Sequence, residues 1–273
     1  MSSFFHFEVQ NCPAYFVGSL FFILTWSILY WRAPQSRSAV LWASITFLPI
    51  GPLLESIYIV DYWRPEHWWY LDIGPIFGLG PLRISLEDFI FTFTCSGMCA
   101  GFFDIVHRRQ NHREITGITL ASYGRLIGAG GICLAVIWIS WRIGRATHTV
   151  WLHSVNAHVI GCLLALPFVV IRRTWAISTL MAAFGGAAFM LIFYALYYVP
   201  IYPNIFERWW LLENLSGIRI FGVLAEEVYW MFVTVLFLGP VVRFCMATNE
   251  KKEWLFPQHY REWKAERAAK RNK

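Results

Sequence analysis

The sequence predicts an all-α integral membrane protein with seven transmembrane helices, arranged as two parallel three-helix repeats joined by a linking helix. Three observations carry this prediction. The chain of 273 residues is 57% hydrophobic and only 15% charged, whereas a soluble domain is about a quarter charged. Seven apolar runs approach the roughly 20 residues that a helix needs to cross a bilayer. Finally, two stretches in different halves of the chain share an order of unusual residues.

The seven apolar runs are expected to be helical, because lipid offers the polypeptide backbone no other hydrogen-bond partners. The expected transmembrane helices cover residues 14–31, 39–60, 86–106, 121–141, 151–171, 175–199 and 219–243. The six cysteines mostly fall inside these runs and form no CxxC motif. We interpret them as small hydrophobic residues.

The duplicated stretch runs from Glu66 to Phe91 and again from Glu207 to Met231. Each copy starts with an acid, a basic residue and a Trp pair, followed by Leu and an acid. A Gly-containing apolar link leads to an acid pair that opens a hydrophobic run. A shared order over about 25 positions indicates an internal duplication. The expected units are repeat 1 (1–107), a linking helix with its loops (108–150), repeat 2 (151–245) and a basic tail (246–273).

Basic residues alternate between the connections. Arginines follow the first, third and fifth expected spans, and the tail after Asn249 carries further lysines and arginines. The positive-inside rule therefore predicts that the N-terminus lies outside and the C-terminus in the cytoplasm. Both acid pairs would then lie on the outer side. The net charge of +6 is concentrated in the tail, which favours a membrane-facing segment over a nucleic-acid partner.

The acid pairs Glu87-Asp88 and Glu226-Glu227 are the first candidates for chemistry. A carboxylate within a span is costly and usually faces the interior of the bundle. A second interpretation stays open for Asp88, since an acid three residues after Ser85 also suits the start of a helix. Adjacent residues point about 100° apart on a helix. We therefore expect one acid of each pair to face a shared central site, where two acids could act as acid and base.

Other polar residues lie in the spans. Glu55 has apolar flanks late in the second span, so it is either a third functional acid or a hydrogen-bond partner of a neighbouring helix. His153, Asn156 and His158 lie in the fifth span without an HxxxH or HExxH spacing. We therefore predict no metal site and favour a polar lining of the same cavity. His107 lies in a basic connection, where we expect it to be solvated.

Aromatic residues fall into two groups. The Trp pairs, including Trp209 and Trp210, are typical of the belt at a membrane interface. The aromatic residues nearest the acids are Tyr58, Phe91, Tyr229 and Trp230. Their ring faces would suit a cationic intermediate through cation–π attraction.

Missing motifs exclude several classes of membrane protein. No lysine precedes Lys251, so no span offers a Schiff base for retinal. No DxxxD pair is present to hold a magnesium diphosphate, and no P-loop occurs. No pair of histidines suggests a bundle haem. The sequence therefore predicts no cofactor.

The acid-pair segments resemble those of the lycopene cyclase domain family, small membrane carotenoid cyclases that include fused seven-helix chains. The family pattern is roughly Pro-Leu-Glu-Glu followed by Phe-rich sequence. Here residues 85–91 read SLEDFIF and residues 224–230 read LAEEVYW. Both copies lack the proline. The resemblance covers roughly residues 39–107 and 175–245.

The resemblance implies non-redox cyclisation of an apolar polyene or prenylated substrate taken from membrane lipid. A carboxylic acid protonates a terminal alkene, the polyene closes on the carbocation, and a base removes a proton. A dry pocket favours the protonated acid and keeps water from the cation. Glu87 and Glu226 are the first choices for this acid–base work, with Asp88 and Glu227 in support and Glu55 as a third candidate.

A non-enzymatic membrane protein is the alternative. The same repeats could build a lipid- or carotenoid-binding subunit or a transporter. A polar line formed by Glu55, Glu87, His158 and Glu226 could then serve the passage of protons or solutes. A long apolar tunnel that opens to lipid, with acids at its end, favours the cyclase. A water-filled path that reaches both faces favours transport, and a tightly packed centre with the acids at the surface favours a structural role.

Overall fold

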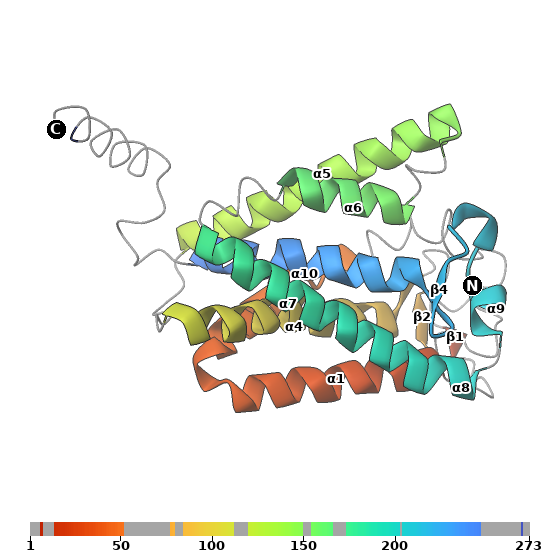
Figure 1. The fold of residues 1–273 in the computed structure, drawn as a ribbon, viewed down its shortest axis with the longest axis horizontal. Helices are drawn as coiled ribbons and strands as arrows, with labels where there is room; N and C mark the ends of the chain where they lie inside the picture. The colour runs from red at the N-terminus through yellow and green to blue at the C-terminus, as the bar shows by residue number, and fades with distance from the viewer. Residues whose placement is uncertain are drawn as a thin grey trace.

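The computed structural model describes residues 6–7, 14–51, 77–79, 84–111, 120–149, 154–165, 173–202, 204–246 and 269. This part of the chain forms a bundle of helices with short strands gathered at one end (Figure 1). Five of the described helical segments are long and apolar enough to cross a membrane: Ala14–Arg32, Glu87–His107, Gly124–Thr147, Ala176–Ile201 and Ala225–Arg243. The protein is therefore a mostly helical, multi-pass membrane protein.

The described helices of the bundle lie within or overlap the apolar runs of the sequence. They are α1 (Ala14–Arg32), α2 (Arg37–Phe47), α4 (Leu86–Asn111), α5 (Leu120–Thr147), α6 (Ser154–Ala165), α7 (Arg173–Phe193) and α10 (Ala225–Met246). A π-helical segment, η5 (Tyr194–Tyr198), and α8 (Val199–Ile201) continue α7. Shorter elements are η1 (Pro34–Ser36), α9 (Ile205–Trp209) and η6 (Leu212–Asn214). Each of the seven expected spans thus contains a described helix, although α2 and α6 are described over only part of theirs.

Helix α10 lies at the centre of the packing. It packs most extensively against α7 and then against α4, while α4 also packs against α2 and α1. Helices α5 and α6 pair with each other and with α10. Glycine permits two of these close approaches. A Cβ on Gly186 of α7 would lie 2.5 Å from Cγ2 of Val235, and one on Gly239 of α10 would lie 2.6 Å from Cβ of Phe103.

The seventh helix begins later than residue 219, where the sequence placed its start. Strands β4 (Arg219–Ile220) and β5 (Val223–Leu224) form an antiparallel hairpin instead. Phe221 and Gly222 at its turn have φ angles of 51° and 83°, and two positive φ angles define the type I′ turn that suits a two-residue hairpin. The acid pair at positions 226–227 therefore lies in the first turn of α10.

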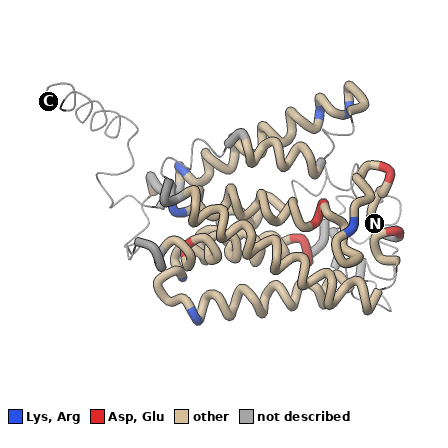
Figure 2. Tube along the Cα trace, viewed as in Figure 1, with Lys and Arg blue, Asp and Glu red and all other residues tan. Residues whose placement is uncertain are grey.

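The first acid pair is positioned in the same way. Strand β2 (Phe77–Leu79) pairs antiparallel with β3 (Ile84–Ser85), and β1 (His6–Phe7) adds to the other edge of β2. Helix α4 follows β3 directly, so the pair at 87–88 lies in its first turn. Figure 2 shows both acid pairs as red segments at the strand end of the two helices. A hairpin thus leads straight into each acid-bearing helix.

A buried ion pair joins the same two helices further along. Arg243 of α10 donates to Asp104 of α4, and both side chains are almost fully buried. The two residues are 139 positions apart, which is also the separation between Asp88 and Glu227. His107 lies near this pair on α4, is buried, and contacts Ser178 at 3.3 Å. The expectation that His107 is solvated is therefore wrong.

Candidate functional site

A cavity of about 170 Å³ lies between the helices. Its wall is mostly apolar and aromatic and draws side chains from α1, α2, α4, α5, α6, α7, η5, α9 and α10. An apolar protein cavity of about 150 Å³ can hold benzene and stays dry. The cavity therefore has room for one ring-sized apolar group, such as the end of a longer chain.

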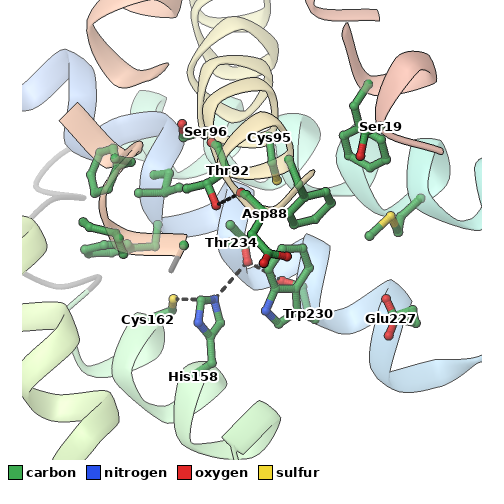
Figure 3. A pocket seen from close by; sticks show the side chains of 18 of the residues that line it. Ser19, Asp88, Thr92, Cys95, Ser96, His158, Cys162, Glu227, Trp230 and Thr234 are labelled. Atoms are coloured by element: carbon green, nitrogen blue, oxygen red, sulfur yellow. Dashed lines mark hydrogen bonds between the residues drawn. The ribbon is translucent and has the colours of Figure 1, made fainter. Parts of the chain in front are cut away.

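Two carboxylic acids belong to the wall of this cavity. Asp88 comes from the first turn of α4 and Glu227 from the first turn of α10 (Figure 3). They are the second members of the two acid pairs. Glu87 and Glu226, the first choices from the sequence, are buried but are not among the lining residues. The expectation that one acid of each pair faces a common site agrees with this geometry, and the order of preference within each pair is reversed.

Asp88 is held by the first helix. The hydroxyl of Tyr15 on α1 donates to Oδ1 of Asp88 at 2.7 Å. The ring of Tyr15 packs edge-on against Trp209, with ring centroids 5.8 Å apart. Asp88 and Tyr15 are both buried, so this hydrogen bond is shielded from water. The contact fixes the direction of the carboxyl group at the cavity wall.

Glu227 is held by residues that follow α7. The indole Nε1 of Trp210 donates to Oε1 of Glu227 at 2.9 Å, and Tyr194 and Tyr198 also interact with this carboxyl. Both tyrosines lie in the π-helical segment η5, a local widening of the helix that often occurs at functional sites. Trp209 and Trp210 are at most 1% exposed. Their assignment to an interfacial belt is therefore wrong.

Glu226 faces the hairpin side of α10. Its Oε1 accepts a hydrogen bond of 2.6 Å from the backbone N–H of Ser216. Its other oxygen, Oε2, is buried and has no hydrogen-bond partner among the described residues. Glu226 therefore ties the segment before β4 to the start of α10, a position that supports the neighbouring Glu227.

Three of the aromatic and polar residues expected near the acids line the cavity. They are Phe91, His158 and Trp230. The ring of Trp230 packs on both others, with centroids 5.9 Å from Phe91 and 5.6 Å from His158. Tyr229 and Asn156 are not among the lining residues and pair with each other, since the Tyr229 hydroxyl donates to Oδ1 of Asn156 at 2.9 Å. Glu55 and Tyr58 lie outside the described residues.

Several residues that line the cavity were not predicted from the sequence. Those with polar groups include Tyr15, Ser19, Thr92, Cys162, Tyr194, Tyr198 and Thr234. Helical periodicity could have found some of them, because residues three, four and seven positions after an inward-facing acid share its face. The lining residues Phe91, Thr92 and Cys95 follow Asp88 with this spacing, and Trp230 and Thr234 follow Glu227 by three and seven positions.

The described part of the chain offers no metal centre there. In it, no group of three or more His, Cys, Asp or Glu side chains could hold a metal ion. The five cysteines that the structure describes are free and buried, which agrees with their interpretation as small hydrophobic residues. The polar side-chain groups that line the cavity include two carboxyl groups, an imidazole, hydroxyl groups and thiols.

No protein-family model matches this chain, and neither does any curated protein or solved structure. The function must therefore be inferred from the cavity itself.

Proposed function

We propose that the protein is a lycopene cyclase-like membrane enzyme that cyclises the end group of an apolar polyene or prenylated substrate. The reaction is initiated by an acid, passes through a carbocation and involves no net redox change. One observation carries the proposal: a buried carboxylic acid from each acid pair, Asp88 and Glu227, lies on the wall of one largely apolar cavity.

Two carboxyl groups are enough to donate the one proton and accept the one proton that the reaction requires. A protonated carboxyl at the cavity wall gives its proton to the terminal alkene, forming a C–H bond and a carbocation. The electrons of a second double bond close the ring on that cation. A base then removes a proton from a ring carbon, and the C–H electrons become the ring double bond. The product is an isomer of the substrate, so the reaction needs no cofactor.

The remaining wall suits a cation that must not meet water. Trp230 and Phe91 are packed together at the cavity, and an aromatic face stabilises a nearby cation by about 0.5 to 2 kcal/mol. Exclusion of water prevents its capture of the cation. An apolar end group would bring no hydrogen-bonding groups of its own, which matches a wall with few polar side chains.

The proposal extends to the architecture. We propose seven spans built as two parallel three-helix repeats, with the N-terminus outside and the C-terminus in the cytoplasm. The hairpin that leads directly into α4 recurs before α10, and the separation of Asp104 and Arg243 equals that of the two cavity acids. A duplicated unit accounts for both facts. The repeats would then each contribute one acid to the cavity.

Pigment analysis in cells that accumulate lycopene tests the proposal. The intact chain should convert lycopene to a cyclic isomer. At least one of Asp88→Asn and Glu227→Gln should lower the conversion by about 10²-fold or more, since a positioned proton-transfer group contributes about 10²–10⁴-fold. Glu213→Gln is the matched control, because Glu213 is exposed and should leave conversion unchanged.

Two results would count against the proposal. If the intact chain forms no cyclic product from lycopene or another polyene, catalysis as described is lost. Copurification of unchanged carotenoid with the protein would then favour the alternative, a carotenoid-binding subunit. If conversion occurs but Asp88→Asn and Glu227→Gln both match wild type, the assignment of these acids is wrong.

A further inference from the structure

His158 on α6 lines the cavity beside Trp230 and Thr234 of α10 and belongs to a short hydrogen-bonded network (Figure 3). Its Nε2 lies 2.9 Å from the hydroxyl oxygen of Thr234 on α10. The same hydroxyl lies 2.7 Å from the backbone carbonyl of Trp230, one helical turn earlier. The thiol of Cys162 is also near, with Sγ 3.5 Å from Nε2.

These hydrogen bonds determine which ring nitrogen of His158 carries the proton. A hydroxyl group has one proton to donate, and the carbonyl of Trp230 can only accept. The Thr234 proton therefore goes to that carbonyl. The Thr234 oxygen then accepts from His158, which places a proton on Nε2. In the neutral imidazole, Nδ1 is left as the nitrogen with a lone pair.

The second ring nitrogen, Nδ1, makes no contact of this kind within the described part of the chain. It is buried and has no hydrogen-bond partner among the described residues, and His158 as a whole is 6% exposed. An acceptor left in this state costs about 1–3 kcal/mol. The ring also packs on Trp230, with centroids 5.6 Å apart. A buried imidazole lone pair beside an aromatic wall suits a group that takes a proton from a cation held there.

We infer that His158 is the base that ends the cyclisation. This inference rests on the proposed function. A protonated carboxyl, that of Asp88 or Glu227, starts the reaction by giving a proton to the alkene. After ring closure Nδ1 of His158 takes a proton from a ring carbon, and the C–H electrons form the ring double bond. Before the next turnover the imidazolium releases this proton and the carboxylate takes up a proton from solvent, so the enzyme ends as it began.

Three variants at His158 and Thr234 test the role of His158 through the rate and the product. With wild type active, His158→Gln should lower formation of the main cyclic product by about 10²–10⁴-fold. The product that still forms should show a shifted ring double bond or an added water, because the cation must lose its charge by another route. Thr234→Val should lower the rate as well, since Nε2 loses the acceptor that fixes its proton. Thr234→Ser should retain wild-type activity and product.

The control is His148→Gln, because His148 is exposed at the end of α5. It should change neither rate nor product. If wild type cyclises and His158→Gln gives the same product at the same rate, the base role is overturned while the proposed function stands. If wild type forms no cyclic product, the proposed function fails and the base role fails with it.

A spectroscopic measurement tests the proton placement separately from activity. The protein is labelled with ¹⁵N at its histidines and purified in detergent, and the His158 signals are identified by their loss in His158→Gln. They should show a protonated Nε2 and an unprotonated Nδ1, and Thr234→Val should disturb this pattern whereas Thr234→Ser should not. A proton on Nδ1 in the wild type would overturn the inference.

Discussion

At the scale of single residues, the choice between neighbouring acids depends on partners that are distant in sequence. Periodicity predicts that one acid of each pair points inward, but it treats both members alike. In the structure the second acid of each pair lines the cavity, where Tyr15 of α1 contacts Asp88 and Trp210 contacts Glu227. These partners lie 73 and 17 positions away from the acids they contact. Sequence reasoning without these contacts could not make the selection.

Trp230 provides a prediction at the same scale. It packs on both Phe91 and His158 at the cavity. Trp230→Leu keeps an apolar side chain but removes the aromatic face, so cyclisation should fall by roughly 2- to 30-fold, which corresponds to about 0.5–2 kcal/mol. Trp230→Phe should lose less. Trp31→Leu is the control, since Trp31 is exposed. Equal activities of Trp230→Leu and Trp31→Leu would show that the Trp230 ring does not stabilise the cation.

At the scale of elements, hydrophobic runs located the helices but not their first turns. Residues 220–224 are apolar and look like the start of a span, yet they belong to a hairpin because Phe221 and Gly222 adopt positive φ angles. Gly222 was the available signal, since glycine adopts this conformation without strain. Hairpin residues and helix residues can both be apolar, so hydropathy alone could not place the boundary.

Two adjacent glycines of α7 provide the prediction for elements. A Cβ on Gly186 would lie 2.5 Å from Val235 of α10, whereas one on Gly185 would meet nothing within 4 Å. Gly186→Ala should destabilise the protein by about 1–3 kcal/mol through overpacking of the α7–α10 contact. Gly185→Ala should leave stability unchanged or slightly raised, because alanine favours helix over glycine. Thermal unfolding in detergent measures both. Equal stabilities of the two variants would contradict the close packing of α7 on α10.

At the scale of the whole molecule, the buried ionisable groups of α4 and α10 lie at two levels along these helices. The cavity acids lie in the first turns of α4 and α10, and the Asp104–Arg243 pair lies further along the same helices. Sixteen helical residues separate the levels on each helix, or about 24 Å at 1.5 Å per residue. The multi-pass helical character followed from the composition and the lengths of the apolar runs. Which residues of α4 and α10 come together at each level did not follow from the sequence, because this depends on the packing of α4 against α10.

The buried ion pair provides the prediction for the whole molecule. Asp104→Asn leaves Arg243 charged and buried without its anionic partner, so it should destabilise the protein by about 3–5 kcal/mol. Exchange of the two charges, Asp104→Arg with Arg243→Asp, should recover part of this loss. Glu207→Gln, which removes the exposed pair with Arg219, should cost at most about 1 kcal/mol. Thermal unfolding in detergent compares the three. Equal stability of Asp104→Asn and Glu207→Gln would show that the buried pair does not hold α4 to α10.

Transfer of a solvent proton to the substrate tests acid-initiated cyclisation most directly. Membranes containing the protein and unlabelled lycopene are incubated in D₂O, and the cyclic product is analysed by mass spectrometry. Because an exchangeable carboxyl supplies the initiating proton and the product is otherwise an isomer, each ring formed should carry one deuterium. A cyclic product without deuterium, or one that has lost two hydrogens, would contradict the account.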